Sequence, residues 1–264
     1  CSGAGGCIAV AYDRTKQAAL ASQPAIAISA AWYSGSMTGV AGVGTLHLPD
    51  ATLLTETFDA ESINNVHLLL GDWTGFPSGD VVVSNGVLRL GADCPGTLRF
   101  DSLTLGPKGN LRIGGGTRDF WHFTYNGRIP LENRAGRNLV IANDLTLQEN
   151  SLLHLYSGAT PYGAIAPFDG FAPSNTALLA AADQNPEAIL SGEVRVGGTI
   201  RVATNAWIYP QSHPTHGGSY RFTAGNVVLD AGGGFSASSL GWSGMGSSLA
   251  GARAAAGMPA SANY

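Results

Sequence analysis

The sequence predicts an all-β fold and, within that class, a parallel β-helix with irregular protruding loops. Three observations support this expectation. Short alternating apolar segments recur along the chain, glycine accounts for 37 of the 264 residues, and few segments have a helical pattern. An antiparallel β-sandwich is the alternative, because short strands between tight turns are also typical of sandwiches.

The composition narrows the function classes. Charged residues make up only 12% of the chain and apolar residues 44%, too apolar for a disordered protein. The net charge is −4 and basic residues form no run, so nothing favours binding to nucleic acid or to an anionic membrane surface. No apolar run is long enough to predict a membrane span. Low charge with abundant glycine is typical of an extracellular or cell-surface β protein.

The N-terminal part, residues 1–50, is expected to be a Gly-rich segment followed by the first strands. Residues 13–22 (DRTKQAALAS) predict one short helix or a turn. Cys1 and Cys7 flank a glycine-rich stretch that can close a small disulfide loop in an oxidising compartment. The alternative is that these two cysteines and Cys94 are free or mispaired thiols.

An internal repeat is the most informative feature of the sequence. Residues 103–113 (LTLGPKGNLRI), 145–155 (LTLQENSLLHL) and 227–237 (VVLDAGGGFSA) each place a second strand eight residues after the first. Residues 81–90 (VVVSNGVLRL) are an earlier version, and residues 194–202 (VRVGGTIRV) are interpreted as a copy with a tighter turn. Such recurrence predicts stacked structural units.

Stacking follows from the length of these strands. Alternation with period two turns one face of each strand inward, but a strand of two or three residues cannot bury that face alone. Piling like strands on one another makes a continuous apolar core. The corners need residues with positive φ, and Asn85-Gly86 and Gly109-Asn110 lie where corners are expected.

The spacing of the repeats is irregular. Leu103 and Leu145 are 42 residues apart, Leu145 and Val194 are 49 apart, and Val194 and Val227 are 33 apart. A coil of about 20–30 residues plus a loop accounts for this variation. The expected β-helical core is residues 51–230, with loops at 114–138, 156–188 and 203–219.

Two segments lie outside the repeat. Residues 174–183 predict a helix with Ser174 as its N-cap. Residues 231–264 form a Gly/Ala/Ser-rich tail with interspersed apolar residues, and we expect this tail to pack on a neighbouring unit or on the flank of the helix.

Several blocks of the sequence carry a family resemblance. Residues 3–13 (GAGGCIAVAYD) and 29–50, which end in GTLHLPD, resemble the start of a repeating unit, and residues 208–222 and 227–244 resemble a strand with a Gly-rich fringe. Together they look like the glycine-rich β-helical repeat regions of very large secreted or surface proteins of environmental bacteria. The cysteines near the N-terminus depart from that pattern. The resemblance implies export, surface display and a scaffold, adhesive or filament-forming role, with no catalytic residues to carry over.

One predicted loop could bind a ligand. It gathers Trp121 and Tyr125 as stacking platforms with Arg128, Arg134 and Arg137 as cations, a combination suited to an acidic sugar. The same loop could instead cap the side of the helix or contact another subunit.

Other candidate sites have simpler interpretations. His213 and His216 (H-P-T-H) are spaced for a shared metal, but they lack a third ligand and read as a structural turn. Trp207 and Tyr209 alternate within one strand and are expected to point inward.

The predicted function is a structural module of an extracellular bacterial surface assembly. A filament, sheath or adhesin would form by stacking and self-association with identical or repeated units. The sequence predicts no catalytic residues, no metal and no cofactor, because its acidic residues are dispersed and no nucleophile motif is present. The alternative is a carbohydrate-binding or polysaccharide-cleaving β-helix protein, since lyases and hydrolases also use this fold.

Overall fold

The computed structural model describes residues 6–30, 44–91, 94–115, 136–156, 190–211 and 219–237. In these ranges nearly all regular structure is strand, and the short helix α1 (Arg14–Ala18) is the one helix described. This helix lies within residues 13–22, where the sequence predicted a short helix or a turn; its N-cap is Asp13, whose side chain accepts a hydrogen bond from the backbone N–H of Lys16. The helix predicted at 174–183 lies outside the described residues.

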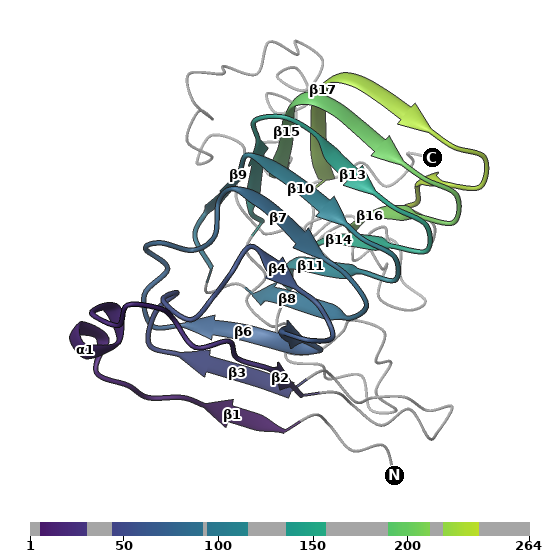
Figure 1. The fold of residues 1–264 in the computed structure, drawn as a ribbon. Coiled ribbons are helices and arrows are strands. Elements are labelled where there is room, and N and C mark those ends of the chain that lie inside the picture. Colours follow the sequence, from purple (N-terminus) through teal and green to yellow (C-terminus); the bar gives the residue numbers. More distant parts are fainter. Residues whose placement is uncertain are drawn as a thin grey trace, which may run out of the picture.

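The strands form two large sheets that curl around a shared core (Figure 1). Sheet 1 runs in the order β1 (Cys7–Ala9), β3 (Gly44–Leu48), β6 (Val66–Leu70), β8 (Val87–Gly91), β11 (Asn110–Gly115), β14 (Leu152–Tyr156), β16 (Trp207–Gln211) and β18 (Gly234–Phe235). Sheet 2 contains β4 (Thr57–Phe58), β7 (Asp80–Val83), β10 (Ser102–Leu105), β13 (Leu145–Leu147), β15 (Leu190–Val202), β12 (Asn138–Ile141) and β9 (Thr97–Phe100), with β17 (Ser219–Leu229) on β15. The short strands β2 (Ile28–Ser29) and β5 (Ile63–Asn64) pair with each other.

Every strand pairing in the described part of the chain is parallel. The antiparallel sandwich, the alternative that the sequence left open, is therefore wrong. The chain alternates between the sheets, so that β7, β10, β13, β15 and β17 are each followed by a strand of sheet 1. The prediction of an all-β fold is confirmed.

The repeats align as stacked columns of apolar side chains. Val81, Leu103 and Leu145 are successive partners in sheet 2, and the next members of this column are Ile200 and Val227. On sheet 1, a second column has the order Leu88, Leu111, Leu153, Ile208, Phe235. The inner members are almost wholly buried and form one core. The alternation in the sequence thus positions these side chains as expected.

One register prediction is wrong. Val194 pairs with Leu139, and Ile200 is the partner of Leu145. The repeat copy therefore begins at Ile200, and the spacings are 42, 55 and 27 residues. The cause is Gly197-Gly198, which occupies the bend where β15 passes from pairing with β12 to pairing with β13. An added Cβ at Gly197 would lie 2.1 Å from the carbonyl oxygen of Ala142, so this bend of sheet 2 requires glycine.

The corners between the two sheets share one turn. After β10, β13, β15 and β17, the third residue has positive φ: Lys108 (57°), Asn150 (60°), Asn205 (58°) and Gly232 (81°). The next residue donates its N–H to the carbonyl three residues back, at 2.9–3.1 Å. Positive φ at the third turn position is typical of a type II turn.

The corner after β10 corrects a detail of the prediction. The residue in the left-handed region is Lys108 rather than Gly109. Gly109 is needed for another reason, since a Cβ there would lie 2.1 Å from the carbonyl oxygen of Val83 on the coil below. At the shorter corner after β7, Asn85 has φ of 50°, as predicted.

Two further predictions are corrected at β16. The segment 203–219 was expected to be a loop, but Trp207–Gln211 form a strand of sheet 1. Within it Ile208 is buried in the core, so the flanking Trp207 and Tyr209 face outward, opposite to the prediction. The next rung decides this orientation, because Ile208 pairs with the core residue Leu153.

Candidate functional site

The predicted sugar-binding residues are only partly within the described structure. Arg137 is described, whereas Trp121, Tyr125, Arg128 and Arg134 lie outside the described residues, as do His213 and His216. The backbone N–H of Arg137 donates to the hydroxyl of Tyr220 at 3.1 Å, and that hydroxyl donates to the carbonyl of Tyr156 at 3.3 Å. Burial raises the pKa of Tyr220, which stays a neutral donor. In the described contacts, Arg137 therefore helps to join β12, β14 and β17.

Among the described residues, neither the cysteines nor possible metal ligands form a further candidate site. Cys7 is exposed on β1 with a free thiol and Cys94 is buried. Cys1 lies outside the described residues, so pairing of Cys1 with Cys7 under oxidising conditions stays a prediction. Among the residues that the structure describes, no three His, Cys, Asp or Glu side chains gather closely enough to hold a metal ion.

On the face of sheet 1 that points away from the core, aromatic and basic side chains form one column, in which His67 and Arg89 are themselves buried. His67, Arg89, Arg112, His154 and Tyr209 follow one another in register on β6, β8, β11, β14 and β16. The rings of His154 and Tyr209 stack with centroids 4.8 Å apart. His154 alternates with the buried Leu153 and Leu155 on β14, which places it on the outer face. Only the register of the strands shows that these five side chains share one line.

The N-terminal end of the stack is covered by an aromatic cluster. Phe58 on β4 and Phe100 on β9 belong to the terminal strands of sheet 2. Phe76, from the segment between β6 and β7, lies with its ring centroid 6.3 Å from Phe58 and 6.4 Å from Phe100, and Trp73 packs on Phe76 at 5.2 Å. The segment carrying Trp73 and Phe76, which we call the aromatic cap, therefore closes sheet 2 at this end.

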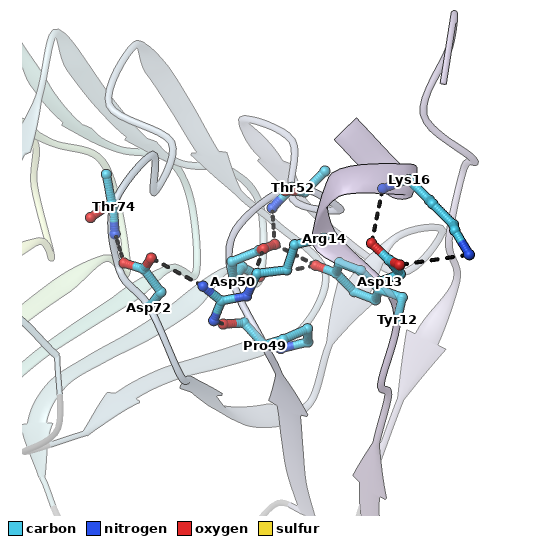
Figure 2. A network of polar contacts seen from close by, with 9 residues as sticks. All are labelled: Tyr12, Asp13, Arg14, Lys16, Pro49, Asp50, Thr52, Asp72 and Thr74. Carbon is cyan, nitrogen blue, oxygen red and sulfur yellow. Dashed lines mark hydrogen bonds and ion pairs between the residues drawn. The ribbon is translucent and has the colours of Figure 1, made fainter. Parts of the chain in front are cut away.

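A polar network holds the aromatic cap to the N-terminal segment (Figure 2). The guanidinium of Arg14 lies 3.3 Å from a carboxylate oxygen of Asp50 and 3.4 Å from one of Asp72, and it also donates to the carbonyl of Pro49. Asp72 in turn accepts the backbone N–H of Thr74 at 2.9 Å. Arg14 thus connects α1 with the turns that follow β3 and β6, next to the aromatic cap.

Asp50 and Tyr12 form the inner part of this network. The hydroxyl of Tyr12 donates to Asp50, which also accepts the backbone N–H of Thr52 at 2.9 Å. Burial alone would raise the pKa of Asp50, but the hydrogen bonds from Tyr12 and Thr52 and the charge of Arg14 hold it below its ordinary value. Burial and the hydrogen bond to Asp50 raise the pKa of Tyr12 to about 12. At neutral pH the network therefore holds α1 to the turns that follow β3 and β6.

The C-terminal end of the described stack differs from the N-terminal end, because apolar side chains are exposed there. We call β17 and β18, residues 219–235, the last coil. Among the described residues, five large hydrophobic side chains are exposed, and four lie here: Val227 (54%), Val228 (37%), Leu229 (47%) and Phe235 (36%). The other is Leu20. Val227, Leu229 and Phe235 continue columns that are fully buried one rung earlier.

The last coil also has open strand edges. β17 pairs with β15 and β18 pairs with β16, and neither has a strand partner on its other edge in the described part of the chain. Unpaired backbone N–H and C=O groups beside exposed apolar side chains favour pairing with another strand. The last coil is thus the candidate association surface.

Comparisons with known proteins identify no relative: no family model, no curated protein and no solved structure matches this chain. Within the described ranges, no helix has the length and apolar character needed to cross a bilayer.

Proposed function

We propose that the chain is a parallel β-helix acting as a structural module of an extracellular surface assembly, and that it self-associates through its last coil. Two sheets of parallel strands joined in alternation, with in-register apolar columns, support the β-helix. The exposed continuation of those columns in Val227, Leu229 and Phe235 is the observation that carries the functional proposal.

The energetics favour weak to moderate association. Fully burying a Val, Leu or Phe side chain contributes about 1.5–3 kcal/mol. These side chains are already partly buried, so each adds about 1 kcal/mol, or about 6 kcal/mol for three residues from each of two copies. Association costs about 4–15 kcal/mol in lost freedom, so edge hydrogen bonds must supply the remainder. Measurements therefore need protein concentrations up to hundreds of micromolar.

Sedimentation velocity over a concentration series tests this role. The wild-type chain should associate, and Val227→Asp and Leu229→Asp should stay monomeric, because each places a charge on the apolar face of the last coil. Val228→Asp is the matched control: its neighbour in register is the exposed Arg201, so Val228 faces outward. Association should survive in that variant. A wild-type chain that is monomeric at every concentration refutes the proposal.

A carbohydrate-binding role is the second candidate. The stacked rings of His154 and Tyr209, next to Arg112 on the preceding rung, are a specific feature in its favour. Aromatic faces with a neighbouring cation suit an acidic polysaccharide. Tyr209→Ala should abolish saturable binding of such a polysaccharide on a glycan array, whereas an array with no binding by the wild-type chain rules this role out.

The extracellular location rests on composition and on the family resemblance. Export should therefore be tested directly, by detecting the native protein outside cells with an antibody to the folded chain. Signal only from lysed cells would exclude an extracellular role while leaving self-association to be judged by sedimentation.

A further inference from the structure

We infer that the partner of the last coil is the last coil of a second copy, joined end to end about a two-fold axis. This inference rests on the proposed self-association and states its geometry. The N-terminal end is a poor partner, because the aromatic cap covers sheet 2 there and the outer strand of sheet 1, β1, has only three residues.

The chain that follows the last coil is also a poor partner. Residues 238–264 contain no Val, Ile or Phe and consist largely of Gly, Ala and Ser. In composition they are a poor match for the exposed columns of Val227, Leu229 and Phe235. A matching rung is present in the last coil of another copy.

The last coil is self-complementary in one register. β17 bends near Gly225, and its first half carries Phe222 and Ala224 on the inner face, packed against the core. Its second half carries Val227 and Leu229 on the inner face, in register with the core residues Ile200 and Val202. Antiparallel pairing of two β17 strands about an axis through the bend places Phe222 opposite Leu229 of the second copy, and Ala224 opposite Val227.

The charges agree with this register. The same pairing places Arg221 opposite Asp230 of the second copy, twice across the interface. Arg221 also lies 3.8 Å from Glu193 of its own chain, and Asp230 is exposed at the end of β17. Opposite charges directly across an antiparallel pair stabilise it. On the other side of the coil, the axis brings together the two β18 edges and their Phe235 side chains.

Two-fold symmetry limits the assembly. A surface that pairs with itself closes on forming a dimer, whereas a head-to-tail contact would continue into a filament. Sedimentation should therefore show monomer and dimer only, and Leu229→Asp should raise the dimer dissociation constant at least tenfold. A ladder of larger species lost in Leu229→Asp overturns the two-fold geometry but keeps the proposed function, and monomers alone overturn both.

Cysteine cross-linking tests the register. In a background with Cys1→Ser and Cys7→Ser, mixing Thr223→Cys with Val228→Cys should give a disulfide-linked dimer, because these outward residues lie opposite each other. Thr223→Cys alone should not cross-link, because its counterpart lies about 17 Å away along the strand. Thr55→Cys, exposed near the other end, is the matched control partner. Equal cross-linking in all mixtures overturns the register.

Truncation after residue 237 tests the rival occupant. If the inference is right, the truncated chain dimerises as the full chain does. If only the truncated chain dimerises, residues 238–264 cover the last coil within one molecule, and the inference is wrong. If truncation abolishes the dimer, those residues form the contact themselves, and the inference is again wrong.

Discussion

The two ends of the stack solve the same physical problem in different ways. At each end of the described stack, the apolar columns stop and the outermost strands have no further strand neighbour among the described residues. At the N-terminal end Phe76 and Trp73 cover the terminal strands of sheet 2, and Arg14 fastens the adjoining turns. At the C-terminal end the columns stop in exposed side chains. The difference shows that a terminal rung does not by itself favour association. Whether its apolar side chains are exposed depends on which other segments of the chain pack over them.

The largest expected effect is at Phe58, whose ring contacts Phe76 of the aromatic cap. Phe58 is almost fully buried, so Phe58→Ala should lower the unfolding free energy by about 3–4 kcal/mol. Phe235→Ala, at the open end, should cost less than about 1 kcal/mol because that ring is already partly exposed. Chemical denaturation of dilute monomer measures both values. Equal losses would mean that the two ends do not differ in packing.

The next effect tests the polar network. Asp50→Asn should lower stability at pH 7 by about 2 kcal/mol, because hydrogen bonds to a charged group are lost. Since folding lowers the pKa of Asp50, its contribution is present above the unfolded value of about 3.9 and disappears as pH falls through the lower folded value. The variant should therefore have a shallower acid limb in a plot of stability against pH.

A matched carboxylate at the open end provides the control. Asp230 is exposed, so Asp230→Asn should change the unfolding free energy of the monomer at pH 7 by no more than about 0.5 kcal/mol. If Asp230→Asn lowered the unfolding free energy as much as Asp50→Asn does, the two ends would not differ in how strongly their polar contacts stabilise the fold.

The last prediction concerns the corners, where the last coil should follow the same rule as the coil before it. Asn205 has φ of 58°, so Asn205→Ala should cost about 1 kcal/mol. Gly232 is its counterpart in the last coil, and a Cβ there would lie 3.7 Å from the Asn205 side chain, an ordinary contact. Gly232→Asn should therefore change the melting temperature by only a few degrees in calorimetry. A large loss would show that the last corner has its own requirement.

Local pattern predicted the repeats well, because alternation and turn chemistry are properties of neighbouring residues. The segments at 81–90, 103–113, 145–155 and 227–237 stack as parallel rungs, as their similarity indicated. The prediction failed at Val194, where Gly197-Gly198 was interpreted as a tight turn within a copy and is instead the bend of sheet 2. One glycine pair is compatible with both interpretations, and only the register of β12 and β13 decides between them.

The candidate site was only half foreseen. The sequence predicted self-association and singled out residues 231–264 as a tail that packs on a neighbouring unit or on the flank of the helix, but it did not indicate which strands are left with open edges. The aromatic cap brings Phe76 onto Phe58 and Phe100, and the network joins Arg14 to Asp72, 58 residues away. Such contacts do not recur at a regular spacing in the sequence, so no local sequence pattern predicts them.

The sequence by itself determined an all-β chain of short strands whose inner faces must be buried together, because each strand is too small to form a core alone. The tertiary structure decided which rungs are neighbours, which way Trp207 and Tyr209 face, and which end is left open. Those outcomes depend on contacts between side chains that are dozens of residues apart in the sequence. Such contacts exist only in the folded chain, so local sequence patterns do not determine them.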